Sequence, residues 1–168
     1  MDQIKREIND VLFPELLMAY HGERHESHLF TRHMNVSLKE LKNRLRRFQV
    51  GQDDIVKSSR FLTNDLSEIA KQLHTCLEQN YAKIEDWHKS RRMGKLEISC
   101  VFPSPIGECI VKNADWNETF QESVLVVILI ESDIPGRLFR ILTAYPDATL
   151  DEIDIIYDAI DLFQANRH

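Results

Sequence analysis

The spacing of apolar residues changes at about residue 94, and this change divides the chain into a helical part and a strand-forming part. Before it, apolar side chains recur every three or four residues, which is typical of amphipathic helices. After it, short runs rich in β-branched and aromatic residues are separated by Pro, Gly, Asn and Asp, which indicates strands joined by turns. A chain with helices first and strands later favours the α+β class.

Three helical regions are predicted in the first part. Residues 2–20 form a leading helix or a helix pair, because Pro14 would kink or restart a helix. A polar, histidine-rich loop follows, and Ser37 with Glu40 then forms a capping box, in which each side chain satisfies a free backbone amide at the start of the next helix. Asn64 is a good N-cap for a long amphipathic helix over residues 65–90.

Four strand-forming runs follow, at residues 95–102, 107–112, 122–131 and 137–145. They predict an antiparallel sheet of about four strands. Thr149 and Glu152 form a second capping box, which predicts a C-terminal helix within residues 147–168. The 168 residues and their 43% apolar content suit one domain, with a leading helix at 1–24, a central region at 25–146 and an acidic helix at 147–168.

Several classes of protein are excluded by composition. The longest apolar run, residues 124–130, is far shorter than the roughly 20 residues that cross a bilayer. Residues 1–20 have no apolar core with a small-residue cleavage site, so no signal peptide is expected. The three cysteines fit neither a disulfide framework nor a metal knuckle. We expect them to be reduced and buried in a cytoplasmic protein.

The distribution of charge matters more than its sum. The net charge of −6 argues at first against a polyanionic substrate such as RNA. However, residues 147–168 hold six acids against one base, whereas residues 21–100 hold fifteen Lys or Arg against eleven Asp or Glu. The middle of the chain is therefore basic and its end is acidic.

Acid–base chemistry is concentrated within residues 21–47. A histidine can take a proton from a ribose 2′-hydroxyl, and an arginine can stabilise the charge that builds on the phosphate. Residues of both kinds occur in this segment: His21, His25, His28, His33, Lys42, Arg44, Arg46 and Arg47. Two simpler interpretations remain, a loop that binds adventitious metal and a solvated helix face.

Two further features have competing interpretations. His25 and His28 resemble half of a zinc site, but no cysteine lies nearby and no second histidine pair occurs at helical spacing, so no metal site is expected. Thr143 and Tyr145 alternate with Ala144, so both hydroxyls would point to one side of a strand and could face a ligand. The alternative is a half-buried edge strand that ends at Pro146.

Six short segments occur in the order found in one protein family. They resemble the RNase A-like toxin domain at the C-termini of contact-dependent growth inhibition proteins and other polymorphic bacterial toxins, and the similarity covers about residues 25–146. The segments are His28–Met34, Glu40–Leu45, Ser58–Phe61, Asn80–Trp87, Ile106–Gly107 and Ile141–Pro146.

The resemblance implies a kidney-shaped α+β fold without disulfides and a cytotoxic ribonuclease, often acting on tRNA, that needs no metal or other cofactor. It assigns catalytic roles by position to five residues: His33, Arg44, Thr143, Tyr145 and the upstream His28. Glu26 and Ser27 stand where Gly-Gly often precedes that upstream histidine. The expected RNA contacts are Arg32, Lys42, Arg46 and Arg47.

The expected reaction is transphosphorylation, in which His33 removes the 2′-hydroxyl proton and a 2′,3′-cyclic phosphate forms. Tyr145 and His28 are both candidates for the proton donor. The protein would act in the cytoplasm of the producing or the target bacterial cell, and a cognate immunity protein or antitoxin is expected; the oligomeric state stays open.

Other hypotheses remain at this point. The chain could be a non-catalytic module that binds RNA or a protein, or a metal-dependent nuclease. The acidic tail could screen the basic face or complete the core.

Overall fold

Five helices and six strands make up the described part of the chain, which confirms the α+β class. The computed structural model describes residues 2–22, 33–34, 36–46, 56–90, 94–112 and 117–148, except for the side chains of Arg46 and Val56. The helices are α1 (Gln3–Asp10), α2 (Pro14–His21), α3 (Leu38–Arg46), α4 (Leu66–Gln79) and α5 (Tyr81–Lys89). The strands are β1 (Val56–Phe61), β2 (Leu96–Val101), β3 (Gly107–Lys112), β4 (Asn117–Glu122), β5 (Val124–Glu131) and β6 (Phe139–Asp147).

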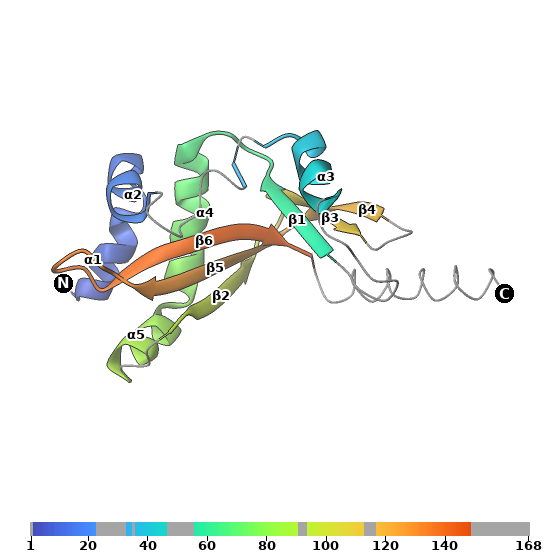
Figure 1. Ribbon diagram of the computed structural model, residues 1–168. Coiled ribbons are helices and arrows are strands. Elements are labelled where there is room, and N and C mark those ends of the chain that lie inside the picture. Colours follow the sequence, from blue (N-terminus) through green and yellow to red (C-terminus); the bar gives the residue numbers. More distant parts are fainter. Residues whose placement is uncertain are drawn as a thin grey trace.

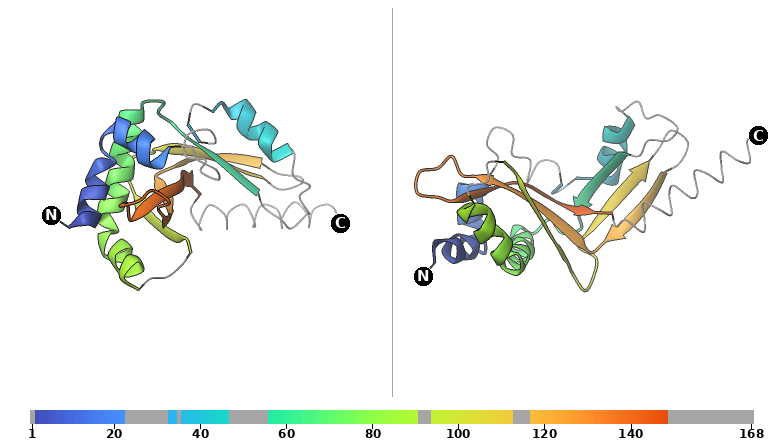
Figure 2. Two further views of the ribbon diagram at one scale, coloured as in Figure 1. Left: turned by 60° about the vertical axis from the view of Figure 1, so that its left-hand side comes forward. Right: turned by 90° about the horizontal axis from the view of Figure 1, so that it is seen from below.

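The strands form two antiparallel sheets instead of the single sheet of about four strands that was expected. One sheet has the order β1-β3-β4 and the other β2-β5-β6. Figure 1 shows α4 crossing behind the β2-β5-β6 sheet and α3 lying beside β1. The two further views show the sheets splaying apart, with the end of β6 reaching β1 (Figure 2).

The helices largely follow the sequence prediction. Pro14 restarts the chain as the first residue of α2, so the leading region is a helix pair. Ser37 and Glu40 make the expected capping box, with the Ser37 amide donating to Glu40 Oε2 at 2.9 Å and the Glu40 amide donating to Ser37 Oγ at 3.1 Å. The N-cap of α4 is Asp65, whose Oδ1 accepts from the Ser67 amide, and not the expected Asn64.

The long helix expected over residues 65–90 is broken at Asn80 into α4 and α5. The side-chain amide of Asn80 donates to the Cys76 carbonyl at 2.8 Å and to the Ser99 carbonyl of β2 at 3.0 Å. Asn80 thus ties the end of α4 to the sheet, a tertiary interaction that helical periodicity does not reveal.

The main core lies between one face of the β2-β5-β6 sheet and the helices α1, α2, α4 and α5. Rows of paired residues from the three strands build this face: Leu96–Leu129–Ile141, Ile98–Val127–Ala144 and Cys100–Leu125–Pro146. A smaller core between α3 and the other sheet contains Val36, Leu41, Leu45 and Ile110. All three cysteines are free and buried, as expected.

An extra residue in β6 changes which side chains face this core. Ile141 pairs with Leu129 and Thr143 pairs with Ile128, so Leu142 between them is left without a partner in the register. A bulge of this kind shifts the alternation of side chains by one position. Ile141 therefore faces the core, whereas Thr143 and Tyr145 face the opposite side of the sheet.

The C-terminal end differs in part from the expected acidic helix over residues 147–168. Asp147 is the last residue of β6, because its pairing with Val124 extends the strand. Residues 149–168 lie outside the described part of the chain. Within the described part, no helix is long and apolar enough to cross a membrane.

Candidate active site

His33 is held against β1 by two hydrogen bonds. Its carbonyl accepts from the Phe61 amide at 2.7 Å, and its ring Nδ1 lies 2.9 Å from the Ser59 carbonyl oxygen. A carbonyl oxygen can only accept, so Nδ1 must carry a proton. In the neutral ring, Nε2 is then the nitrogen that can accept a proton, which is the form that a general base needs.

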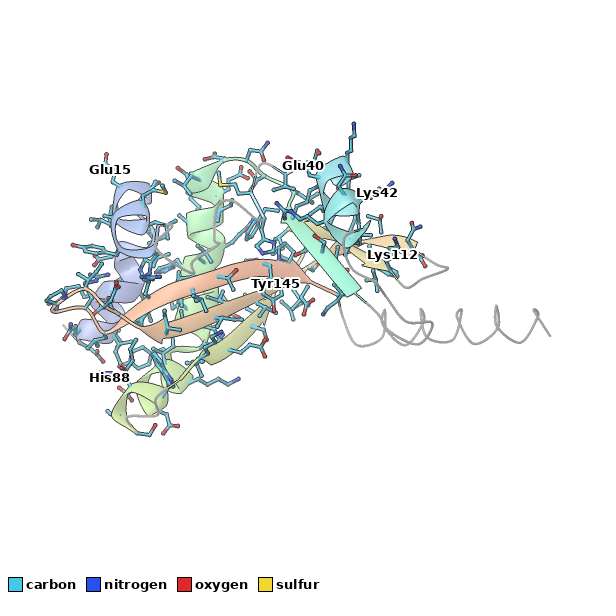
Figure 3. The ribbon with its side chains drawn as sticks, in the orientation of Figure 1. Glu15, Glu40, Lys42, His88, Lys112 and Tyr145 are labelled. Atoms are coloured by element: carbon cyan, nitrogen blue, oxygen red, sulfur yellow. The ribbon has the colours of Figure 1, made fainter. Side chains whose placement is uncertain are left out.

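The ring of Tyr145 lies against that of His33. Their centroids are 5.6 Å apart and their planes are tilted by 34°. Burial raises the pKa of the Tyr145 phenol above its ordinary value, and the negative charges of Asp147 and Glu97 raise it further. The phenol therefore keeps its proton at neutral pH. Figure 3 labels this side chain on β6, near β1.

The face of the β2-β5-β6 sheet that carries Tyr145 also carries Thr143. The register places Ser99, Val126 and Tyr145 in one row across the three strands and Glu97, Ile128 and Thr143 in the next. Thr143 and Tyr145 are each half-buried. Both hydroxyl-bearing residues share one side of the strand, as their alternation in sequence predicts, and this side is the face opposite the core.

The two sheets meet close to this site. Lys57 Nζ of β1 lies 2.8 Å from Asp147 Oδ1 at the end of β6, forming an ion pair between the sheets. Gly107 of β3 packs directly under Pro146, because a Cβ added at Gly107 would lie 2.1 Å from Pro146 Cγ and 2.6 Å from the Arg60 carbonyl oxygen. A side chain at position 107 would therefore force the sheets apart.

Arg60 is a residue near the site that no role was predicted for. Its Nη1 donates to the Val36 carbonyl at 2.9 Å, and its Nη2 lies 3.4 Å from both carboxylate oxygens of Glu108. It thereby fixes the chain between His33 and α3 to β1 and β3. The similarity of Ser58–Phe61 to the toxin family was the signal that could have found it.

The other predicted residues are brought together only in part. Arg44 and Lys42 are on α3, which packs against β1 and β3; Arg44 is half-buried and Lys42 is exposed (Figure 3). Arg46 ends the same helix, but its side chain is not described. His28, Arg32 and Arg47 lie outside the described residues, as does His25.

No group of three His, Cys, Asp or Glu side chains within the described ranges is arranged to hold a metal ion. The chemistry that the described site offers comes from one imidazole, one phenol and one threonine hydroxyl, with an arginine on the neighbouring helix.

Comparison with known proteins identifies relatives of this arrangement. The family model described as the bacterial CdiA-CT RNase A domain matches residues 27–146. The crystal structure of a CdiA-CT/CdiI complex from Y. kristensenii 33638 contains a similar chain, with a TM-score of 0.59 and 24% sequence identity over 73% of this chain and 100% of that chain. This similarity shows a shared fold. No curated protein matches the chain.

Proposed function

The chain belongs to the family of bacterial CdiA-CT RNase A domains, and from this membership we propose that it is a toxin endoribonuclease that cleaves RNA, with tRNA as a candidate substrate, without a metal ion. One observation carries the catalytic part of the proposal. The Ser59 carbonyl fixes the His33 ring with Nδ1 protonated, beside the hydroxyl-bearing face of β6.

The first step uses His33 as the general base. Nε2 of His33 accepts the proton of a ribose 2′-hydroxyl, and the 2′-oxygen forms a bond to the adjacent phosphorus. The bond from phosphorus to the 5′-oxygen breaks, which leaves a 2′,3′-cyclic phosphate. DNA, which lacks the 2′-hydroxyl, is not a substrate.

The remaining side chains act on the phosphate and the leaving group. Tyr145 is protonated at neutral pH and donates to the departing 5′-oxygen in this proposal. Thr143, in the next row of the same face, holds the phosphate or the base. Arg44 stabilises the negative charge of the pentavalent phosphorane, and Lys42 contributes a contact to the RNA backbone.

A partner and a site of action follow from the relatives. The Y. kristensenii CdiA-CT was crystallised in complex with CdiI. We propose that this chain likewise has a cognate inhibitor, because a cell that makes a ribonuclease must survive it, and that it acts on RNA in the cytoplasm of a bacterial cell.

The test is cleavage of purified total tRNA with and without EDTA. We expect fragments that end in 2′,3′-cyclic phosphate, at an unchanged rate in EDTA, and no cleavage of DNA of the same sequence. Loss of activity in EDTA would establish a metal-dependent nuclease instead. Retention of tRNA without cleavage would favour a non-catalytic binding module.

The variant His33→Ala should lose about 10²–10⁴-fold in rate, which is the usual contribution of a general base. The matched control is His88→Ala, because His88 is exposed on α5, far from Tyr145 (Figure 3). It should cleave as fast as the parent. Equal activity of His33→Ala and the parent would contradict the assignment of the base.

A further inference from the structure

His21 is a buried histidine that the proposed mechanism does not use. It is the last residue of α2 and is fully buried. Its ring stacks on Phe139 of β6 with a centroid distance of 5.8 Å. Its Nδ1 accepts a hydrogen bond from the Ile141 amide at 3.0 Å. The sequence pattern predicted a polar loop at this position.

The Ile141 amide, which donates this hydrogen bond to His21, lies where β6 departs from regular pairing. Ile141 directly precedes Leu142, the extra residue of the bulge. Bulges interrupt the hydrogen-bond ladder, and a buried amide without an acceptor is strongly disfavoured. His21 supplies an acceptor for the amide of Ile141. The bulge that follows Ile141 decides which face of the sheet Thr143 and Tyr145 occupy.

The His21 ring is suited to accept and not to carry charge. Burial, together with the positive charges of Arg137 and Arg140, lowers the pKa of His21 to about 3. The ring is therefore neutral, with Nδ1 free of a proton and Nε2 protonated. No described side chain or carbonyl accepts from Nε2. An apolar side chain would fill the same space without leaving a buried N–H unpaired, so packing alone does not account for a histidine.

We infer that His21 is a positioning residue, which holds the β6 bulge so that Thr143 and Tyr145 lie on the face opposite the core, where Tyr145 packs on His33. Its effect on catalysis rests on the proposed function. His21 precedes residues 27–146, the range of the family match. The N-terminal helix pair is thus part of what aligns the site.

The first experiment needs no substrate. His21→Phe keeps an aromatic ring but removes the acceptor, whereas His21→Gln offers a carbonyl oxygen in its place. We expect His21→Phe to speed hydrogen exchange of the Ile141 amide roughly tenfold or more and to move the pKa of Tyr145 toward its ordinary value, measured by absorbance against Tyr145→Phe. His21→Gln should restore both measurements in part.

The second experiment compares kcat and KM. A shift of about 1 Å at a catalytic group can cost roughly 100-fold in rate, so we expect a lower kcat for folded His21→Phe and a partial recovery for His21→Gln. A purely structural role would lower the melting temperature and leave kcat of the folded enzyme unchanged. The control is His74→Phe, because His74 makes its polar contacts with Asn9, near the end of α1, and with Glu78 of α4.

Parent-like amide exchange and Tyr145 titration in His21→Phe would overturn the inference. If that variant does not fold, His21→Met takes its place, since its flexible apolar side chain also lacks a strong acceptor. An inactive parent protein would contradict the proposed ribonuclease, while exchange and titration would still decide the role of His21.

Discussion

His33 and Tyr145 are in contact, and one can accept a proton while the other holds one. The Ser59 carbonyl selects the tautomer of His33 that can accept a proton at Nε2. Burial and two nearby carboxylates keep the proton on the Tyr145 phenol. The proposed base and the proposed acid thus each have the protonation state that their role in acid–base catalysis requires before any substrate binds.

Removal of the Tyr145 hydroxyl tests the acid alone. Tyr145→Phe keeps the ring that packs on His33, so the melting temperature should change little. The cleavage rate should fall about 10²-fold or more, because the leaving oxygen loses its donor. Cleavage of an RNA dinucleotide at saturating concentration measures this. An undiminished kcat would transfer the donor role to another group, with His28 as the remaining candidate.

The raised pKa of Tyr145 also predicts how stability depends on pH. The folded protein holds this proton more tightly than the unfolded chain, so the contribution is complete below the unfolded pKa of about 10 and is lost as pH rises through the higher folded value. Urea unfolding at pH 8 and at pH 11 should therefore show a larger loss of stability for the parent than for Tyr145→Phe. An equal loss in both proteins would mean that the phenol is not perturbed.

At the scale of elements, the sequence predicted best where the pattern is local. Pro14 and the Ser37–Glu40 capping box mark real helix starts. Strands β1 and β4 were not predicted, because Val56–Phe61 and Asn117–Glu122 are mostly polar and owe their extended form to pairing with β3. A pattern within one segment cannot reveal a partner strand that lies far away in the chain.

The candidate site likewise was predicted where its features are local in sequence and missed where they depend on distant residues. Alternation placed Thr143 and Tyr145 on one side of a strand, but the bulge at Leu142 decides which side this is. The burial of His21 arises from residues more than 100 positions later in the chain, Phe139 and Ile141. Neither feature leaves a local pattern in the sequence, so the structure was needed to find them.

Substitution of Gly107 tests whether the contact between the two sheets aligns the site. In Gly107→Ala the new Cβ collides with Pro146 and with the Arg60 carbonyl, so β3 and β6 must separate. We expect a loss of about 1–3 kcal/mol in the free energy of unfolding, as for other overpacked sites, and a loss of activity as Tyr145 moves away from His33. Urea denaturation and tRNA cleavage measure the two effects.

Gly94→Ala is the control for that substitution. Gly94 has φ +129°, so alanine strains the backbone there, but nothing lies within 4 Å of the added Cβ. The control should lose stability without losing activity in the folded protein. Full activity in Gly107→Ala would show that the contact with Pro146 does not align the site.

At the scale of the molecule, the two sheets supply different halves of the site. The β1-β3-β4 sheet holds His33 through β1 and supports α3 with Arg44, whereas the β2-β5-β6 sheet presents Thr143 and Tyr145. Lys57 with Asp147 and Gly107 with Pro146 join them. The distance between the proposed base, His33, and the proposed acid, Tyr145, therefore depends on the relative position of the two sheets.

The position of β6 depends in turn on its contacts with α1 and α2. Ile4, Ile8, Val11 and Leu17 are buried in the main core. The carboxylate of Glu7 is also fully buried and accepts from the amide of Leu138 at 3.0 Å, just before β6. Arg137, beside it, pairs with Asp10 at 2.7 Å. The N-terminal helices thus stabilise the connection between β5 and β6 as well as the core.

A protein that begins at residue 23 should therefore fail to fold, although it retains the whole range of the family match, 27–146. Burial of each large apolar side chain contributes about 1.5–3 kcal/mol, and a domain is stable by only about 5–15 kcal/mol. Loss of these four buried side chains, Ile4 and Ile8 of α1, Val11 just after it and Leu17 of α2, removes a comparable amount and exposes the core. Circular dichroism and urea denaturation test this, and addition of a peptide of residues 1–22 should restore part of the structure and activity. A stable, fully active protein that begins at residue 23 would show instead that β6 holds its bulge without the N-terminal helices.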